Sequence, residues 1–300
     1  MGPPVIEAHA RDLWTAGDGT GTTVATAHIA ARLDGPRHHL VEIVTTPAVD
    51  GLGALVGAVV GPGFRAKVDA AVPALRGTGA LLYLLLDDLP GATLVSGYSM
   101  LHAGVVGRVP HDEYLDARGD LCAGWRIGGT MLRSVEEIGR PPMLQGPVAP
   151  ELDAGGDVMA WHELPAAMTP NGMRRIRRID VARGGGDTDP LVVDAMFRDT
   201  HMDDHGVVRI VHEYHLAAEV EPETFTIVSI MATPRVLPYR ECPDAAASAQ
   251  RVVGVTTTGL RAHTRAELVG ASTCTHLNDV LRALEDVEPL AGAITEEASR

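Results

Sequence analysis

The sequence contains few of the residues on which several large classes of protein depend. Aromatic residues make up only 4% of the 300 residues, too few for a surface that stacks nucleic-acid bases. Lys and Arg number 25 against 39 Asp and Glu, and the net charge of −14 argues against binding to phosphate backbones. We therefore expect no nucleic-acid partner.

Long apolar runs and export signals are also missing. Runs such as Leu81–Leu86 are far too short to span a bilayer, so we expect no membrane partner. The first residues do not combine a basic stretch with an apolar one, which predicts a cytoplasmic location. The chain has only three cysteines, and in a reducing compartment thiols bind metal or react more often than they form disulfides.

What the chain does contain is an internal repeat. Val5–Pro47 aligns without a gap on Val192–Pro234, at an offset of 198 − 11 = 187 residues. With small gaps the match continues to Gly63-Phe-Arg-Ala66, which aligns on Gly259-Leu-Arg-Ala262. A duplication acts as an internal control, because residues kept in both copies are candidates for scaffold. Reactive residues found in one copy alone are candidates for chemistry.

The reactive residues are concentrated in the second copy. His212-Glu213 in that copy aligns with Ala25-Thr26 in the first. Cys274-Thr-His276 aligns with Leu81-Leu-Tyr83, and the segment that contains Cys242 has no counterpart. By contrast, Arg198-Asp199 has the twin Arg11-Asp12, which indicates an ion pair that builds the fold.

These residues also carry a resemblance to a known family. Cys274-Thr-His-Leu277 at the start of a predicted helix, a Cys-Pro at 242–243 and a His-acid pair on a preceding strand resemble the bacterial DUF2889 family, whose function is uncharacterised. Gly61-Pro-Gly-Phe-Arg-Ala-Lys67 in the first copy is similar to the family's segment before that motif. The resemblance implies a tandem DUF2889 protein with a degenerate N-terminal unit, and it implies no reaction.

Local patterns predict an α+β fold. Segments 22–33, 39–46, 208–220 and 224–233 are rich in β-branched residues and partly alternate, as strands do. Asp244–Val253 and Thr275–Leu284 have apolar residues at helical spacing. Strands followed by helices indicate two pseudo-repeat units, each an antiparallel sheet followed by helices, joined by a partly helical connector.

We expect three segments along the chain. These are a degenerate N-terminal repeat over 1–93, a connector over 94–171 and a C-terminal repeat over 172–300 that carries the site. Two similar units can share a self-complementary interface, so the chain could resemble a dimer internally or form a homodimer. The basic run 174–178 reads as a solvated strand edge with Ile176 and Ile179 turned inward, or as a contact for a substrate carboxylate or phosphate.

The candidate site combines two cysteines and two histidines. Cys242, Cys274, His276 and His212 form a ligand set that suits tetrahedral zinc. At a helix N-terminus, backbone N–H groups would lower the pKa of Cys274. Glu213 and Glu241 could orient an imidazole or act as bases.

Other interpretations of the same residues stay open. Cysteines are often small buried hydrophobic residues, which is also the simplest reading of Cys122. Alternatively, Cys274 could be a nucleophile whose proton is accepted by His212 or His276. Thr275 could simply cap the helix.

The function expected from this sequence is therefore a lyase or hydrolase acting on a small organic substrate. A metal or a Cys/His pair in the C-terminal repeat would supply the chemistry, with His212, Glu213 and Cys274 as catalytic residues. The alternative is a non-catalytic protein that binds a metal or a small molecule, with a structural Cys/His site. A structural metal site has four protein ligands, whereas a catalytic one keeps a position open.

Overall fold

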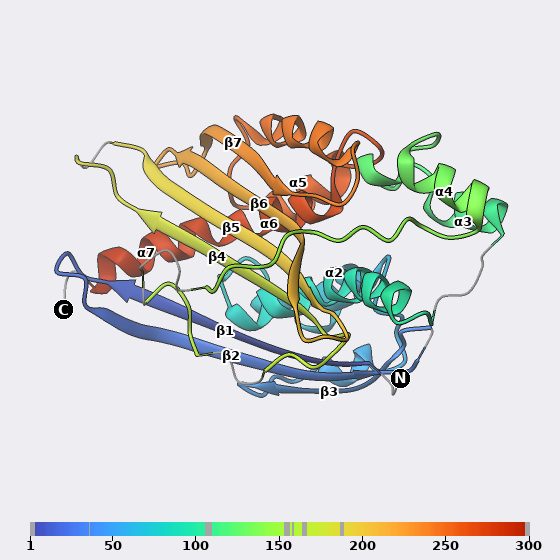
Figure 1. Ribbon diagram of the computed structural model, residues 1–300. Coiled ribbons are helices and arrows are strands. Elements are labelled where there is room, and N and C mark those ends of the chain that lie inside the picture. The colour runs from blue at the N-terminus through green and yellow to red at the C-terminus, as the bar shows by residue number, and fades with distance from the viewer. Residues whose placement is uncertain are drawn as a thin grey trace. The chain divides into compact units, whose positions relative to one another are not determined.

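A computed structural model describes residues 4–35, 37–105, 110–152, 157, 159–163, 167–186 and 189–297. These residues form an antiparallel sheet of three strands and another of four, together with α- and 3₁₀-helices (Figure 1). The expected α+β class is therefore confirmed. Among the described residues, no helix is both long and apolar enough to cross a membrane.

The chain forms two compact units. Unit 1 combines Met1–Leu94 with Asp286–Arg300, and unit 2 comprises Val95–Glu285. These bounds differ from the expected segments for two reasons. Helix α2 (Leu81–His102) crosses the first boundary, and the C-terminal helix α7 (Val287–Glu297) belongs with the first sheet.

Unit 1 is built on a sheet of order β1-β2-β3. Its elements are β1 (Val5–Thr15), β2 (Gly21–Leu33), β3 (Leu40–Thr46), η1 (Leu52–Leu55), α1 (Phe64–Ala71), η2 (Pro73–Leu75), the first part of α2, and α7. Strand β2 turns Ala27, Ile29, Ala31 and Leu33 into the core, which is the side-chain period of a sheet with one buried face. Phe64 and Leu86 pack in the same core.

Unit 2 is built on a sheet of order β4-β5-β6-β7. Its elements are the end of α2, α3 (His111–Arg118), η3 (Ala123–Trp125), α4 (Thr130–Ile138), β4 (Met173–Ala182), β5 (Leu191–Met202), β6 (Val208–Val220), β7 (Ile227–Val236), η4 (Cys242–Val252), α5 (Leu260–Glu267), α6 (Thr275–Ala283) and most of η5 (Leu284–Asp286). Helix α6 packs against β5 through its buried apolar stripe, which includes Leu277 and Leu281.

Sheet β1-β2-β3 and strands β5-β6-β7 have matching registers. The pairs His9↔His28 and Met196↔His215 are separated by the sequence offset, since 196 − 9 = 187 and 215 − 28 = 187. Irregularities fall at matched places too, namely Asp12/Leu13, Asp199/Thr200, Arg32/Leu33 and Glu219/Val220. Even two uncommon left-handed residues correspond, because His38 has φ 55° and Phe225 has φ 53°.

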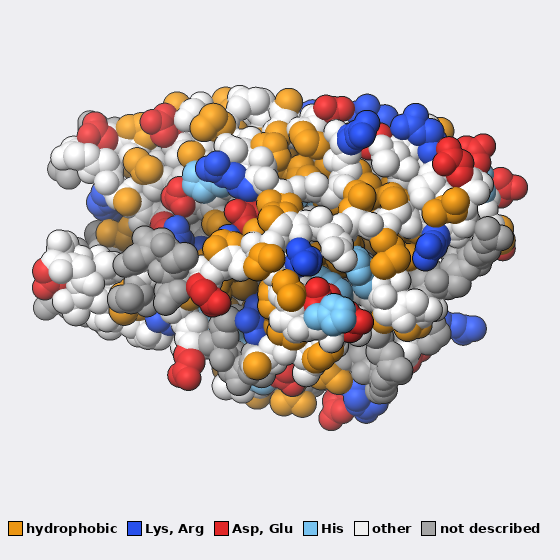
Figure 2. Space-filling view, viewed as in Figure 1, with side chains coloured by type: hydrophobic (Ala, Val, Ile, Leu, Met, Phe, Trp, Pro, Cys, Tyr) orange, Lys and Arg blue, Asp and Glu red, His pale blue; other side chains and the backbone are white. Residues whose placement is uncertain are grey.

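The helical predictions were met in part. The helix expected at Thr275–Leu284 is confirmed as α6. The one expected over Asp244–Val253 is instead the 3₁₀-helix η4, which begins at Cys242 with Pro243 in its first turn. On the surface, the face shown in Figure 2 mixes basic side chains with acidic ones and with scattered apolar ones.

Candidate metal centre

Three neighbouring strands of unit 2 align an arginine, an aspartate and a histidine in one row. Arg175 on β4 is the register partner of Asp199 on β5, and Asp199 is the register partner of His212 on β6. Register partners in an antiparallel sheet project from the same face, so the three side chains meet. Asp199 is completely buried, and the Arg175 side chain is only 8% exposed.

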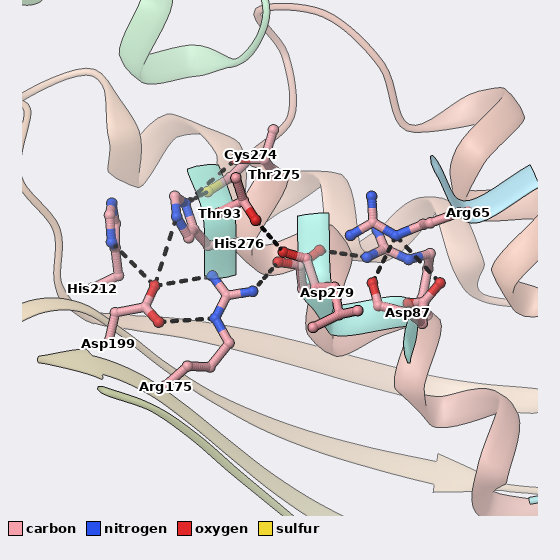
Figure 3. A network of polar contacts seen from close by, with 12 residues as sticks. Arg65, Asp87, Thr93, Arg175, Asp199, His212, Cys274, Thr275, His276 and Asp279 are labelled. Carbon is pink, nitrogen blue, oxygen red and sulfur yellow. Dashed lines mark hydrogen bonds and ion pairs between the residues drawn. The ribbon is translucent and has the colours of Figure 1, made fainter. Parts of the chain in front are cut away.

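Helix α6 adds a second imidazole to this row. Cys274 is in an extended conformation at the helix N-cap, which places His276 at the second helical position. The imidazole of His276 stacks on that of His212, with ring centroids 3.6 Å apart and an interplanar angle of 19°. Figure 3 shows both rings directed at the Asp199 carboxylate.

The three groups converge without forming good hydrogen bonds. His212 Nδ1 lies 3.5 Å and His276 Nε2 lies 3.7 Å from the same oxygen, Asp199 Oδ2. Both distances exceed the usual N–H···O range of about 2.7–3.2 Å. Among the described residues, neither nitrogen has a hydrogen-bond partner, although both are buried.

These separations resemble those between ligands of one metal ion. Metal–ligand bonds of about 2.0–2.2 Å at a tetrahedral angle place two ligand atoms roughly 3.4 Å apart. The ligand atoms of Asp199, His212 and His276 all lie within 4.8 Å of one another. Two imidazoles and a carboxylate are ligands that zinc and other divalent transition metals accept.

Arg175 holds the carboxylate in place. Its Nε donates to Asp199 Oδ1 at 2.9 Å and its Nη2 donates to Asp199 Oδ2 at 3.1 Å. Its Nη1 donates to Asp279 Oδ2 at 2.8 Å, and Asp279 also accepts from Arg282. Two guanidinium groups and two carboxylates therefore form a buried and formally neutral network. The expectation of a solvated strand edge is wrong for Arg175.

The charge states follow from this packing. Burial alone would raise the pKa of Asp199, but the Arg175 guanidinium and the two imidazoles hold it well below its usual value. Burial, together with the neighbouring His212, lowers the pKa of His276 to about 3. At neutral pH the site therefore contains an ionised carboxylate and a neutral His276 imidazole, the forms that bind metal.

The cysteines expected as ligands do not join this group. Cys274 Sγ lies 3.9 Å from Nδ1 of His276, on the side of the ring away from Asp199. One imidazole cannot direct both of its nitrogens at the same ion. Among the described residues, no cysteine belongs to a group of three ligand atoms within 4.8 Å of one another, so the four-ligand set of Cys242, Cys274, His276 and His212 is not assembled.

The expected activation of Cys274 is also contradicted. Burial raises the pKa of the Cys274 thiol to about 12, although the backbone N–H groups of Leu277 and His276 act in the opposite direction. Burial likewise raises the pKa of Cys242 and of Cys122. Cys242 and Cys122 both lie close to Gly124. The point where a Cβ of residue 124 would stand is 2.8 Å from Cys242 Sγ and 4.0 Å from Cys122 Sγ, so these two thiols are neighbours. Protonated, buried thiols are the state of core residues rather than nucleophiles.

The two glutamates have other roles. Glu213 follows His212 on β6 and therefore points to the opposite face, where it pairs with Arg198 Nε at 2.5 Å. The expected Arg198–Asp199 ion pair is thus wrong, because the two residues have separate partners. Glu241 accepts from the backbone N and Oγ1 of Thr130 at 2.8 and 2.9 Å, at the start of α4.

Asp199 and Arg175 are the members of the site that the sequence did not indicate. Asp199 has a twin in Asp12, and this similarity favoured a scaffold role. The pairing of β5 with β6, which places Asp199 opposite His212, was not predicted, because no strand was expected over Leu191–Met202. Arg175 could not be recognised without knowing that β4 joins the edge of this sheet.

Comparison with known proteins finds a family match within the second half of the chain. Residues 173–289 match the family described as protein of unknown function DUF2889. This confirms the resemblance read from the C-terminal motif, and the matched segment contains all of Arg175, Asp199, His212 and His276. Neither the curated proteins nor the solved structures contain a match to this chain.

Proposed function

We propose that unit 2 binds a divalent metal ion, zinc by preference, through Asp199, His212 and His276. The observation that carries the proposal is the convergence of three buried ligand atoms at separations too long for hydrogen bonds and suited to coordination. Arg175 orients the carboxylate, as partners of metal ligands commonly do. The site lies within the DUF2889 segment.

The ligand set favours catalysis. Three protein ligands leave a coordination position for water or substrate, whereas structural zinc sites use four. The charge of Asp199 is already offset by Arg175, and the imidazoles contribute none. The ion would therefore keep most of its positive charge, polarise a carbonyl strongly and lower the pKa of bound water. We infer a lyase or hydrolase whose small organic substrate carries an anionic group that ligates the ion.

A small cavity of unit 2 is lined in part by residues that immediately precede His212 in the chain. It has a volume of about 200 Å³ and is lined by residues that include Tyr98, Leu144, Ile210 and Val211. Ile210 and Val211 immediately precede His212 on β6, where the ladder with β5 is irregular. The volume suits a substrate of a few heavy atoms rather than a cofactor-sized molecule.

Burial favours a second candidate, a structural metal site. Asp199 is 0% exposed, and His212 and His276 are each 9% exposed. An ion that is enclosed to this extent could serve as a staple between α6 and the sheet, with binding linked to folding. The two candidates differ in whether metal removal abolishes a reaction or only lowers stability.

Elemental analysis of the full chain, purified without affinity metals, tests the site itself. Wild-type protein should retain metal through dialysis, and His212→Gln and His276→Gln should each lose one ion per chain. His215→Gln is a matched control on the same strand, because His215 pairs with Asp194 at 2.6 Å on the other face. Equal metal content in His212→Gln and wild type would overturn the proposal.

We also propose that the chain is a tandem pair of DUF2889-like units, the first of them degenerate. The ungapped 187-residue offset, the matching registers and the irregularities at corresponding positions support this. An experimental structure in which β1 and β5 pair with non-equivalent strands would contradict it. A cytoplasmic location and a homodimer are further expectations.

A further inference from the structure

A second group of metal-binding side chains lies on the outward face of the unit 1 sheet. His9 on β1 and His28 on β2 are register partners, so their rings project from the same face. Glu7 lies two residues before His9 and therefore on that face as well. The alternate residues Ile6, Ala8 and Ala10 pack against the core, which fixes the outward direction of the other set.

The three side chains are already close together. His28 Nε2 lies 2.8 Å from Glu7 Oε2, and the centroids of the His9 and His28 rings are 4.3 Å apart. One ligand atom from each residue lies within 4.8 Å of the other two. The His28 side chain is 31% exposed and that of Glu7 is 54% exposed, so an ion can reach the group from solvent.

This geometry suits a cation better than two protonated histidines. Neighbouring imidazolium rings repel each other, whereas a single divalent ion can bind both rings in their neutral form and the carboxylate as well. We propose that Glu7, His9 and His28 form a surface site for a borderline divalent ion such as Zn²⁺, Ni²⁺ or Cu²⁺. With three protein ligands, water or an external ligand completes the coordination.

The corresponding positions of the unit 2 sheet hold only two of the three potential ligands. The residues at the offset of 187 are Asp194, Met196 and His215, since 194 − 7, 196 − 9 and 215 − 28 all equal 187. There His215 Nε2 still contacts Asp194, at 2.6 Å, but a methionine replaces the second imidazole. Strand β4 also places Arg178 Nη2 3.5 Å from Asp194. Among the described residues of unit 1, β1 is an edge strand of its sheet, so no strand lies beside Glu7 in the way that β4 lies beside Asp194.

The site is independent of the buried centre proposed in unit 2. It uses other residues, and its exposure predicts exchangeable metal rather than an ion retained through dialysis. Calorimetric titration of the full chain with Zn²⁺ after dialysis against a chelator provides the test. The chain with His212→Gln, which lacks a ligand of the buried centre, should still bind one Zn²⁺ per chain at the surface site.

His9→Met introduces the residue found at the matched place in unit 2. It should lower the affinity of the surface site for Zn²⁺ by at least about ten-fold. Removing a residue that only hydrogen-bonds to a metal ligand already costs about that much affinity, and removing the ligand itself should cost no less. His39→Gln is the matched control, since His39 Nδ1 contacts Asp34 at 2.8 Å as a His–carboxylate pair that belongs to no group of three clustered ligand atoms in the described residues. That variant should bind like the parent chain.

Two results would overturn the proposal. The first is an unchanged Zn²⁺ affinity in His9→Met. The second is a His212→Gln chain that is folded, as circular dichroism shows, but binds no Zn²⁺ at the surface site. If His212→Gln unfolds, the same comparison of His9→Met with His39→Gln is made in the wild-type background. Failure of the buried centre would leave these results unaffected.

Discussion

Asp12 and Asp199 occupy matched register positions 199 − 12 = 187 residues apart, yet the pKa values of their carboxyl groups shift in opposite directions. Burial, together with nearby Asp286, raises the pKa of Asp12 to about 6. Arg175 and two imidazoles overcome burial and lower that of Asp199. In the part of unit 1 that the structure describes, the sheet has no strand equivalent to β4, and alanine and tyrosine stand where unit 2 has His212 and His276. At the same backbone position, the surroundings therefore disfavour the ionised carboxylate in unit 1 and stabilise it in unit 2.

The raised pKa of Asp12 predicts a pH-dependent loss of stability. In the unfolded chain this carboxyl ionises near its ordinary value of 3.8, whereas in the folded chain it does so near 6. Between these pH values the folded state binds more protons, so this group lowers the free energy of unfolding as pH rises, and the cost persists above pH 6. Asp12→Asn should raise the free energy of unfolding at pH 7.5 by about 1–2 kcal/mol after allowing for solvent screening, and change it little at pH 4. Urea denaturation at both pH values checks this, and an equal effect at both would contradict it.

Removing the cation of the buried network should be costly. Arg175→Met would leave Asp199 and Asp279 buried without the guanidinium that bonds both of them. The expected loss is about 3–5 kcal/mol, because breaking one partner of a buried ion pair leaves an uncompensated charge. Arg178→Met is the control on the same strand, since Arg178 is 28% exposed and pairs with partly exposed Asp180, and it should cost no more than about 1 kcal/mol. Similar denaturation midpoints for the two variants would argue against the network.

The cysteines should be inert in the folded protein. Cys122 and Cys242 are each 6% exposed and Cys274 is 2% exposed, and burial raises the pKa of all three thiols. A thiol reagent should modify none of them quickly in native buffer and all three in denaturant. Rapid stoichiometric modification of Cys274 in the folded chain would instead support the nucleophile interpretation.

Two glycines at corresponding places in the two units should respond alike to substitution by alanine. Gly63 precedes α1 with φ 81° and Gly259 precedes α5 with φ 85°, and a Cβ at either place would meet nothing within 4 Å. Only the left-handed backbone therefore opposes a side chain, so Gly63→Ala and Gly259→Ala should each destabilise the protein by about 1 kcal/mol. Gly97→Ala in the interior of α2, where φ is not positive, should stabilise it by about 0.5–1 kcal/mol instead. Thermal melts of the three variants measure these differences.

Much of the fold was accessible from the sequence because strand periodicity and β-branched residues report local structure. The expected strand at 208–220 coincides with β6, and the one at 22–33 lies within β2. Strand β5 was harder to recognise, since its polar end from Arg198 to His201 interrupts the apolar alternation. That interruption exists because Asp199 faces other buried polar groups instead of apolar core.

The sequence by itself determined the α+β class, the match to DUF2889 and the concentration of reactive residues in the second half of the chain. It also singled out His212 and His276, because the N-terminal segment that aligns with this half lacks them. Only the tertiary structure decided which atoms meet. Strand register brings Arg175 and Asp199 beside His212, and the packing of α6 directs one nitrogen of His276 toward them and the other toward Cys274. Residue types indicate which ligands are available, but the direction of each side chain depends on contacts between segments that are distant in sequence.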